Sequence, residues 1–225
     1  MISKRGSFLL LTSNFDSYVI LENNTLRIES ELPTNIIRLY DISYFSSKNL
    51  TIYSKSQSFL WAQFSGIYFQ DLVISNLLCI YGEDECFAHL ENTSITISSS
   101  IFMNWTSYCA NNLLYGINSQ ITLVNSSFSN LKAFYYTSVM YFENSNLYFR
   151  NTSFFNYTKG LVESLNCGIE IFDSSFSNEN NYNLLTQSVN DVFSTLNMVS
   201  NEVTICNSTF EQNYNEFSDG GVIIF

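Results

Sequence analysis

Few side chains in this sequence could carry acid–base chemistry. His89 is the one histidine, and histidine is the side chain that ordinarily titrates near neutral pH. Glycoside hydrolysis needs two close carboxylates, and the sequence contains no Asp-Asp pair. The densest acidic stretch is Glu83-Asp84-Glu85. Its carboxylates could bind calcium, but we interpret the stretch as a solvated loop. We therefore expect no catalytic residue, no metal ion and no cofactor.

Two further ionisable side chains depend on how the strands face. His89 shares a predicted inward-facing column with Trp61 and Tyr115, which favours a packed core histidine over a catalytic one. Glu163 falls in the same column, where a buried carboxylate would be costly, so we expect a local change of register or a solvated coil there. Arg150 lies on the predicted outer face, where an exposed charge is the ordinary outcome.

The five cysteines show neither a CxxC motif nor the spacing of metal ligands. They are Cys79, Cys86, Cys109, Cys167 and Cys206. We expect most of them to be buried thiols that pack as small apolar side chains. A disulfide among the first three is the alternative, and it would require an oxidising compartment.

Eight Asn-x-Ser/Thr sequons occur, which an Asn- and Ser-rich sequence also produces by chance. Their asparagines are Asn23, Asn49, Asn92, Asn104, Asn125, Asn151, Asn156 and Asn207. If the protein is secreted, we expect the candidate glycan acceptors to be Asn23, Asn49, Asn92 and Asn104. Asn125, Asn151 and Asn207 are expected to stack on one another instead, for the reason given below.

Composition excludes several classes of protein. Hydrophobic residues make up 46% and charged residues 13%, which is not a disordered composition. The net charge of −11 argues against a nucleic-acid partner, because binding a polyphosphate requires a basic face. No run approaches the ~20 apolar residues of a membrane-spanning helix, and the apolar run 8–11 is shorter than that of a signal peptide. The sequence also holds 28 asparagines but one proline, which indicates many tight turns.

A repeat in the sequence determines where these side chains lie. The decapeptide ITLVNSSFSN at 121–130 has apolar residues at alternate positions, then Asn, and an apolar residue three positions later. Copies of the pattern begin at 26, 50, 67, 95, 121, 147, 169 and 203, so the mean step is (203 − 26)/7, about 25 residues. A second apolar patch precedes most copies, again with a spacing of two, which is typical of strands.

Three short strands in each coil predict an all-β, right-handed parallel β-helix of about eight coils. A leucine-rich repeat is the rival architecture, but its LxxLxL spacing is not kept. We expect equivalent residues of successive coils to stack in columns. One column is a polar ladder at a turn: Asp71, Asn125, Asn151, Asp173 and Asn207. The other is an inner aromatic stack: Phe102, Phe128, Phe154, Phe176 and Phe210.

The last coil carries a resemblance to a known family. Residues 210–213 match FxxN, and 220–223 are similar to GGAI. The paired motifs resemble those of the chlamydial polymorphic outer-membrane proteins, and the coil pattern over nearly the whole chain looks like the pectin-lyase-like repeats of protist surface proteins. The resemblance implies an extracellular, adhesive role with glycans or surface proteins as partners. A carbohydrate-active enzyme of the pectin-lyase-like fold is the alternative, and a gene remnant without function is a third.

The repeat also predicts the organisation of the chain. Residues 1–17 are expected to form a partial coil or cap, and 18–225 the β-helix domain. The sequence stops at GVIIF, inside the first strand of a ninth coil that would be uncapped. We therefore expect the chain to be part of a longer cell-surface or secreted protein, whose signal or anchor lies elsewhere. The oligomeric state stays open.

Overall fold

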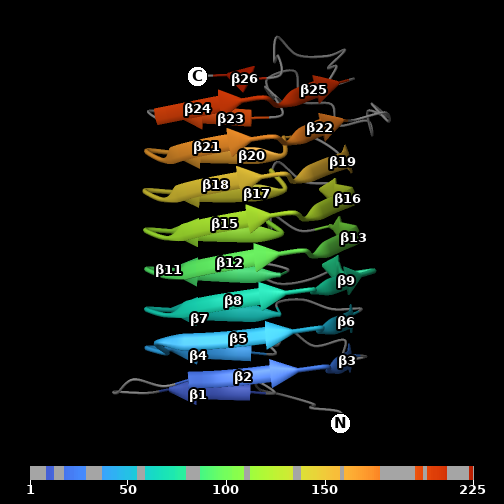
Figure 1. The fold of residues 1–225 in the computed structure, drawn as a ribbon, viewed down its shortest axis with the longest axis vertical. Helices are drawn as coiled ribbons and strands as arrows, with labels where there is room; N and C mark the ends of the chain where they lie inside the picture. The colour runs from blue at the N-terminus through green and yellow to red at the C-terminus, as the bar shows by residue number, and fades with distance from the viewer. Residues whose placement is uncertain are drawn as a thin grey trace.

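The fold is a parallel β-helix. The computed structural model describes residues 9–12, 18–28, 37–54, 59–79, 87–108, 112–133, 138–157, 160–177, 196–199, 202–211 and 223–224. Every regular element in these ranges is a β-strand, and each pairs in parallel with the equivalent strand one coil away (Figure 1). The predicted class is therefore confirmed, and the stacked sheets exclude the leucine-rich repeat.

Each coil passes through three sheets, which we name sheets A, B and C. Sheet A contains β1 (Leu9–Thr12), β4 (Ile37–Tyr40), β7 (Leu60–Gln63), β11 (Ala88–Glu91), β14 (Leu114–Ile117), β17 (Met140–Glu143), β20 (Val162–Leu165), β23 (Leu196–Val199) and β26 (Ile223–Ile224). Sheet B contains β2 (Tyr18–Glu22), β5 (Tyr44–Lys48), β8 (Gly66–Gln70), β12 (Ser94–Ser98), β15 (Gln120–Val124), β18 (Asn146–Arg150), β21 (Gly168–Phe172) and β24 (Glu202–Cys206). Sheet C contains β3 (Thr25–Ile28), β6 (Thr51–Ser54), β9 (Val73–Ser75), β13 (Ile101–Ser107), β16 (Ser127–Ala133), β19 (Ser153–Tyr157), β22 (Ser175–Ser177) and β25 (Thr209–Glu211), with β10 (Leu78–Cys79) beside β13.

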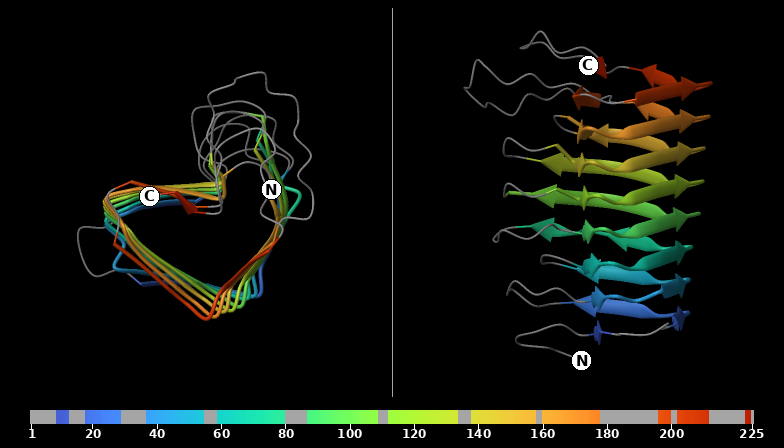
Figure 2. Two further views of the ribbon diagram at one scale, coloured as in Figure 1. Left: turned by 90° about the horizontal axis from the view of Figure 1, so that it is seen from above. Right: turned by 90° about the vertical axis from the view of Figure 1, so that its left-hand side faces the viewer.

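The coils wind in a right-handed sense. In Figure 1 the near strands of sheet B run to the right while the far strands of sheet A run back to the left as the chain climbs. Seen from above in Figure 2, the three sheets surround one interior, and the strands of successive coils lie over one another with a small, steady twist. A side chain at one position of a coil therefore lies over the same position of the coil below.

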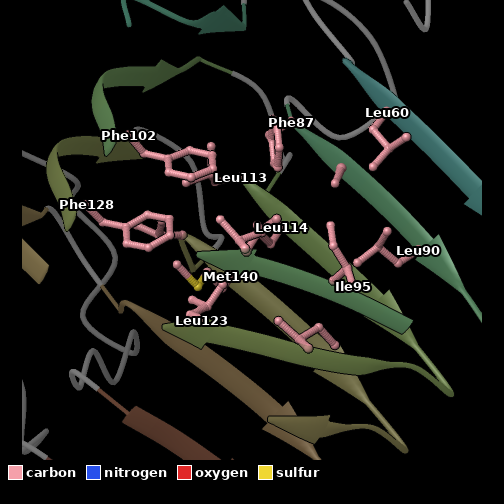
Figure 3. Packing of buried hydrophobic residues seen from close by; sticks show 14 of the residues in the cluster. Leu60, Phe87, Leu90, Ile95, Phe102, Leu113, Leu114, Leu123, Phe128 and Met140 are labelled. Carbon is pink, nitrogen blue, oxygen red and sulfur yellow. The ribbon is translucent and has the colours of Figure 1, made fainter. Parts of the chain in front are cut away.

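The core fills this interior from all three sheets. Along the described strands of sheets A and B, buried and more exposed side chains alternate, as in the pattern of β12, because successive side chains of a strand point to opposite faces. Figure 3 shows Phe102 and Phe128 of sheet C lying face to face and pointing toward Leu114 and Leu123 of the other sheets. Apolar burial along the whole rod supplies the main drive to fold.

One residue with left-handed backbone makes each of the described turns from sheet A to sheet B and from sheet B to sheet C. The turns from sheet A to sheet B use Asp41, Phe64, Asn92, Asn118, Asn144 and Asn166, and those from B to C use Asn23, Asn49, Asp71, Ser99, Asn125, Asn151, Asp173 and Asn207. Their φ angles lie between 48° and 56°. Asn and Asp tolerate this conformation better than other side chains that carry a Cβ, which explains the abundance of asparagine.

A buried hydroxyl follows most of these turn residues. Ser119 accepts a hydrogen bond from the backbone N–H of Thr93 at 3.1 Å and donates to the carbonyl of Ile117 at 2.8 Å. Ser126 does the same for Ser100 at 3.2 Å and Val124 at 2.9 Å. Since a buried N–H without a partner is costly, the hydroxyl columns allow the chain to turn tightly against the core.

Two expectations about register were wrong. The copies that begin at 26 and 50 form β3 and β6 of sheet C, whereas the other copies lie in sheet B. Strands of both sheets share the same apolar alternation, so the pattern alone does not tell them apart. In sheet A, two consecutive residues such as Phe87 and Ala88 are both buried where the chain bends into the strand. This bend shifts the alternation by one position, so His89 and its equivalents face outward.

Candidate functional site

A column of aromatic side chains runs up the outer face of sheet A, and we name it the outer aromatic column: Trp61, His89, Tyr115 and Tyr141. Parallel pairing places each directly over the one below. Their ring centroids lie 6.3, 5.0 and 5.4 Å apart in that order, with interplanar angles of 26°, 30° and 16°. All four are partly exposed. His89 is thus a surface residue, which corrects the expectation of a core histidine.

Two of the four strands in this column carry a carboxylate two residues after the ring, Glu91 and Glu143. The Nε2 of His89 lies 2.8 Å from Oε1 of Glu91, whose Oε2 accepts a hydrogen bond from Gln63 at 3.0 Å. Both side chains of the His89–Glu91 pair are partly exposed. An exposed ion pair contributes little to stability, so the pair mainly orients the imidazole at the surface.

The upper end of the column is acidic. Glu163 lies above Tyr141 in the same column. Glu143 lies two residues after Tyr141 on strand β17. Partial burial raises the pKa of the Tyr141 phenol, and the charges of Glu143 and Glu163 raise it further. Because Glu163 faces outward and is only half-buried, its carboxylate does not carry the desolvation cost that an inward position would impose.

The geometry of the column limits its chemistry. Because the rings stack on one another, each covers part of the face of its neighbour. The ring edges carry the indole N–H, the imidazole nitrogens and the phenol hydroxyls, which are directional hydrogen-bonding groups. Among the described residues, no three His, Cys, Asp or Glu side chains are grouped so that they could hold a metal ion.

The predicted polar ladder lies at the turn between sheets B and C. Asn151 Nδ2 donates to Asn125 Oδ1 at 2.9 Å, and Asn207 Nδ2 donates to Asp173 Oδ1 at 2.6 Å. Asp71 occupies the same turn position three coils below Asn151 in sequence order, with Ser99 and Asn125 between. The amides therefore link neighbouring coils outside the backbone ladder, as in stacked amide ladders generally.

Three of the four candidate glycan acceptors lie at turns between sheets, and the fourth, Asn104, lies within β13 of sheet C. Asn49 Nδ2 donates to Asn23 Oδ1 at 2.8 Å in the column that also holds Asn125. Asn92 lies at the turn between sheets A and B. All eight sequon asparagines have positive φ. In four of them the Asn is followed by a Ser or Thr and then by a strand that begins with Ser or Thr, so the turn itself produces the sequon: Asn92, Asn125, Asn151 and Asn207.

A second amide ladder, which the sequence did not predict, lies at a kink within sheet C. Asn104 Nδ2 donates to Asn76 Oδ1 at 3.2 Å, Asn130 to Asn104 at 3.0 Å, and Asn156 to Asn130 at 2.6 Å. The signal was the Asn that stands two residues after the inward Ile or Phe of each of these coils. It could have been found by aligning the coils on that inward residue.

The inner aromatic stack lies in sheet C. The ring centroids of Phe102, Phe128, Phe154, Phe176 and Phe210 are separated by 4.6, 5.0, 5.1 and 4.6 Å in that order. The first four side chains are buried, and Phe210 at the upper end is partly exposed.

The cysteines differ in role. Cys167 lies at the turn between sheets A and B, where other coils have a buried Ser or Thr. Its Sγ accepts a hydrogen bond from Ser145 N–H at 3.4 Å and donates to the carbonyl of Leu165 at 3.3 Å. Burial raises the pKa of this thiol. Cys206 is exposed with a free thiol. The structure does not describe the side chain of Cys79. It also leaves out Cys86, Cys109, Glu83-Asp84-Glu85 and residues 220–222 of the 220–223 motif.

Comparison with known proteins adds no family to this picture. No protein-family model matches the chain, and no curated protein matches it significantly. Within the part of the chain that the structure describes, no helix is long and apolar enough to cross a membrane.

Proposed function

We propose that the chain is a non-catalytic structural and adhesive β-helical module of a cell-surface or secreted protein. The observation that carries the proposal is the use of its polar side chains. Asn, Ser and Thr, which make up most of its polar chemistry, bond to neighbouring coils at the turns. They hold a straight rod together and leave long, regular outer faces available to partners.

The outer aromatic column of sheet A is the contact surface that we propose for glycans or surface proteins. It presents ring edges with hydrogen-bonding groups, flanked by Glu91 and Gln63, along several successive coils. A ligand that repeats along its length, such as a polysaccharide or an extended protein segment, could engage equivalent groups on successive coils. Such repeated weak contacts add through effective concentration.

Binding of the purified chain to glycan arrays and to fixed cells tests this proposal. Replacing Trp61 and Tyr115 together by Ser is expected to reduce binding at least tenfold, because it removes two of the four rings. The matched control replaces Tyr68 and Tyr148, partly exposed tyrosines on the outer face of sheet B, and is expected to retain binding. Equal loss in both variants, or no binding by the native chain, would contradict the proposal.

A carbohydrate-active enzyme is the second candidate, favoured by Glu143 and Glu163 on the same face around Tyr141. Two carboxylates and a phenol are groups that glycoside cleavage can use. The test is release of reducing or unsaturated sugar from pectin, alginate and neutral polysaccharides. Activity that disappears in both Glu143→Gln and Glu163→Gln would replace the adhesive proposal with the enzymatic one.

A further inference from the structure

Two tyrosines of neighbouring coils stack on each other on the outer face of sheet A. Tyr115 of β14 and Tyr141 of β17 are directly paired in the parallel register. Their ring centroids are 5.4 Å apart, and the ring planes differ by 16°. Two nearly parallel rings at this separation are in contact over part of their faces. The ring carbons beside the two hydroxyls are therefore close neighbours.

The parallel stack holds this tyrosine pair in place. β14 and β17 pair with each other, and sheet A continues below them with β11 and above them with β20. Tyr115 also stacks on His89 at 5.0 Å. Both tyrosines are partly exposed, so a reagent in water can reach the phenols while the rings stay opposed. The pair is thus positioned in advance for a reaction between its two rings.

The phenol of Tyr141 has a proton acceptor beside it. Glu143 lies two residues further along β17 and is within hydrogen-bonding reach of this phenol. Glu163 adds a second negative charge above the ring. A phenol that loses one electron becomes a strong acid, so a neighbouring carboxylate promotes the oxidation by accepting the proton.

We propose that Tyr115 and Tyr141 form a dityrosine cross-link when a haem peroxidase with hydrogen peroxide oxidises the protein. Each phenol gives up one electron and one proton and becomes a phenoxyl radical, and Glu143 accepts the proton of Tyr141. The two radicals couple through a carbon–carbon bond between ring positions ortho to the hydroxyls, and tautomerisation then restores both phenols. Two electrons and two protons leave in total, and one hydrogen peroxide takes them up to give two molecules of water.

The cross-link joins two successive coils covalently. Positions 115 and 141 are 141 − 115 = 26 residues apart, so the bond closes one full coil of the chain. Both hydroxyls survive the coupling, and the hydrogen-bonding edge of the outer aromatic column is kept. The inference goes beyond the proposed function and does not depend on it, because the reaction requires only the stacked pair and the oxidant.

A second tyrosine pair is less suited to this coupling. Tyr18 and Tyr44 are paired on β2 and β5, but their ring centroids are 6.1 Å apart and the rings are tilted by 43°. The better overlap of Tyr115 and Tyr141, together with Glu143, favours the link on sheet A.

Two tyrosines on the outer face of sheet B supply the matched control. Tyr68 and Tyr148 are partly exposed, as Tyr115 and Tyr141 are. Neither has a tyrosine as its paired neighbour on the adjacent strands. The paired residues are Ser46 and Thr96 for Tyr68, and Thr122 and Glu170 for Tyr148.

Treatment of the dilute native chain with peroxidase and hydrogen peroxide tests the proposal. We expect dityrosine fluorescence in chains that still migrate as monomers. Mass spectrometry of their peptides is expected to show Tyr115 joined to Tyr141 with the loss of two hydrogen atoms. Tyr115→Phe and Tyr141→Phe keep the ring stack, and each is expected to lower the fluorescence of the monomer at least tenfold.

Replacing Tyr68 and Tyr148 together by Phe is expected to leave that fluorescence unchanged. Circular dichroism checks that all variants fold. Monomers in which Tyr115 and Tyr141 stay unlinked, a link mainly between Tyr18 and Tyr44, or an equal loss in the control variant would each overturn the proposal.

The thermal midpoint of unfolding gives a second readout. Closing a loop of this length in a domain of this size is expected to raise the midpoint by about 10 °C, because the cross-link lowers the entropy of the unfolded chain. Treated Tyr141→Phe should show no rise. Glu143→Gln is expected to lower the yield of the link, because an amide does not take up the phenol proton. A rise in Tyr141→Phe equal to that of the native chain would trace the stabilisation to another oxidation, and an unchanged yield in Glu143→Gln would overturn the role of Glu143.

Discussion

Two aromatic columns stack with similar spacing, but one lies in the core on sheet C and the other on the outer face of sheet A. In the inner stack, Phe128 lies 4.6 Å from Phe102 and 5.0 Å from Phe154, centroid to centroid. In the outer column, Tyr115 lies 5.0 Å from His89 and 5.4 Å from Tyr141. Phe128 is fully buried, whereas Tyr115 is partly exposed.

This comparison separates geometry from energy. Parallel coils place like positions over one another, so aromatic rings stack wherever the sequence repeats them, inside or outside. The stability that a ring contributes depends on the apolar area removed from water. The inner stack should therefore hold the fold together, while the outer column contributes little to stability and stays available to a partner.

The largest expected effect comes from removing one ring of each column. Phe128→Ala should lower the free energy of unfolding by about 3–5 kcal/mol, because it leaves a cavity between two neighbouring rings. Tyr115→Ala should lower it by only about 0.5–1.5 kcal/mol, the range of an aromatic pair contact. Urea unfolding followed by circular dichroism measures both. Equal losses would show that the outer column is as important to the fold as the inner one.

The sequence predicts this inner column well because its cause is local and repeated. Phe128 follows its turn residue Asn125 by three positions, and the same spacing separates Phe154 from Asn151, so one coil predicts the next. His89 shows where such an inference fails. The direction of its side chain depends on a bend at Phe87 and Ala88, where two consecutive residues enter the core. A regular alternation of apolar residues in the sequence does not show where such a bend interrupts it.

The surface sites were less predictable for a related reason. The pairing of His89 with Glu91 requires the outward facing that the bend creates. The first two copies of the repeat, which begin at 26 and 50, lie in sheet C, whereas the other copies lie in sheet B. The apolar alternation within a coil can be read from the sequence, whereas contacts between coils depend on how the coils stack in three dimensions.

Two glycines, one facing inward and one facing outward, also differ in how closely their surroundings are packed. A Cβ on inward-facing Gly116 would lie 2.9 Å from Cδ1 of Phe142 and 3.3 Å from Cδ1 of Ile121. Gly116→Ala is therefore expected to destabilise the protein by about 1–3 kcal/mol through overpacking. A Cβ on outward-facing Gly168 would lie 2.7 Å from Oδ1 of Asn146, the movable end of an exposed side chain.

Gly168→Ala is accordingly expected to be tolerated, and to stabilise by about 0.4–1 kcal/mol through the lower entropy of the unfolded chain. Thermal unfolding of the two variants beside the native chain measures the difference. If Gly116→Ala proved the more stable of the two, the inner packing would be looser than the stacked rings indicate.

The smallest expected effect is the pH dependence of the outer column. Partial burial, and then the charges of Glu143 and Glu163, raise the pKa of Tyr141 above its ordinary value of 10.0. The folded state therefore binds this proton more tightly than the unfolded state does, so the resulting stability is present below pH 10.0 and is lost as pH rises through the raised pKa.

Tyr141→Phe should flatten the loss of unfolding free energy in this alkaline range. Urea titrations at a series of pH values from about pH 8 to 11 would measure the effect. Glu143→Gln should flatten it only in part, because desolvation and Glu163 remain. An unchanged slope in Tyr141→Phe would mean that the phenol titrates alike in both states, and the column would then be more open to water than its stacking implies.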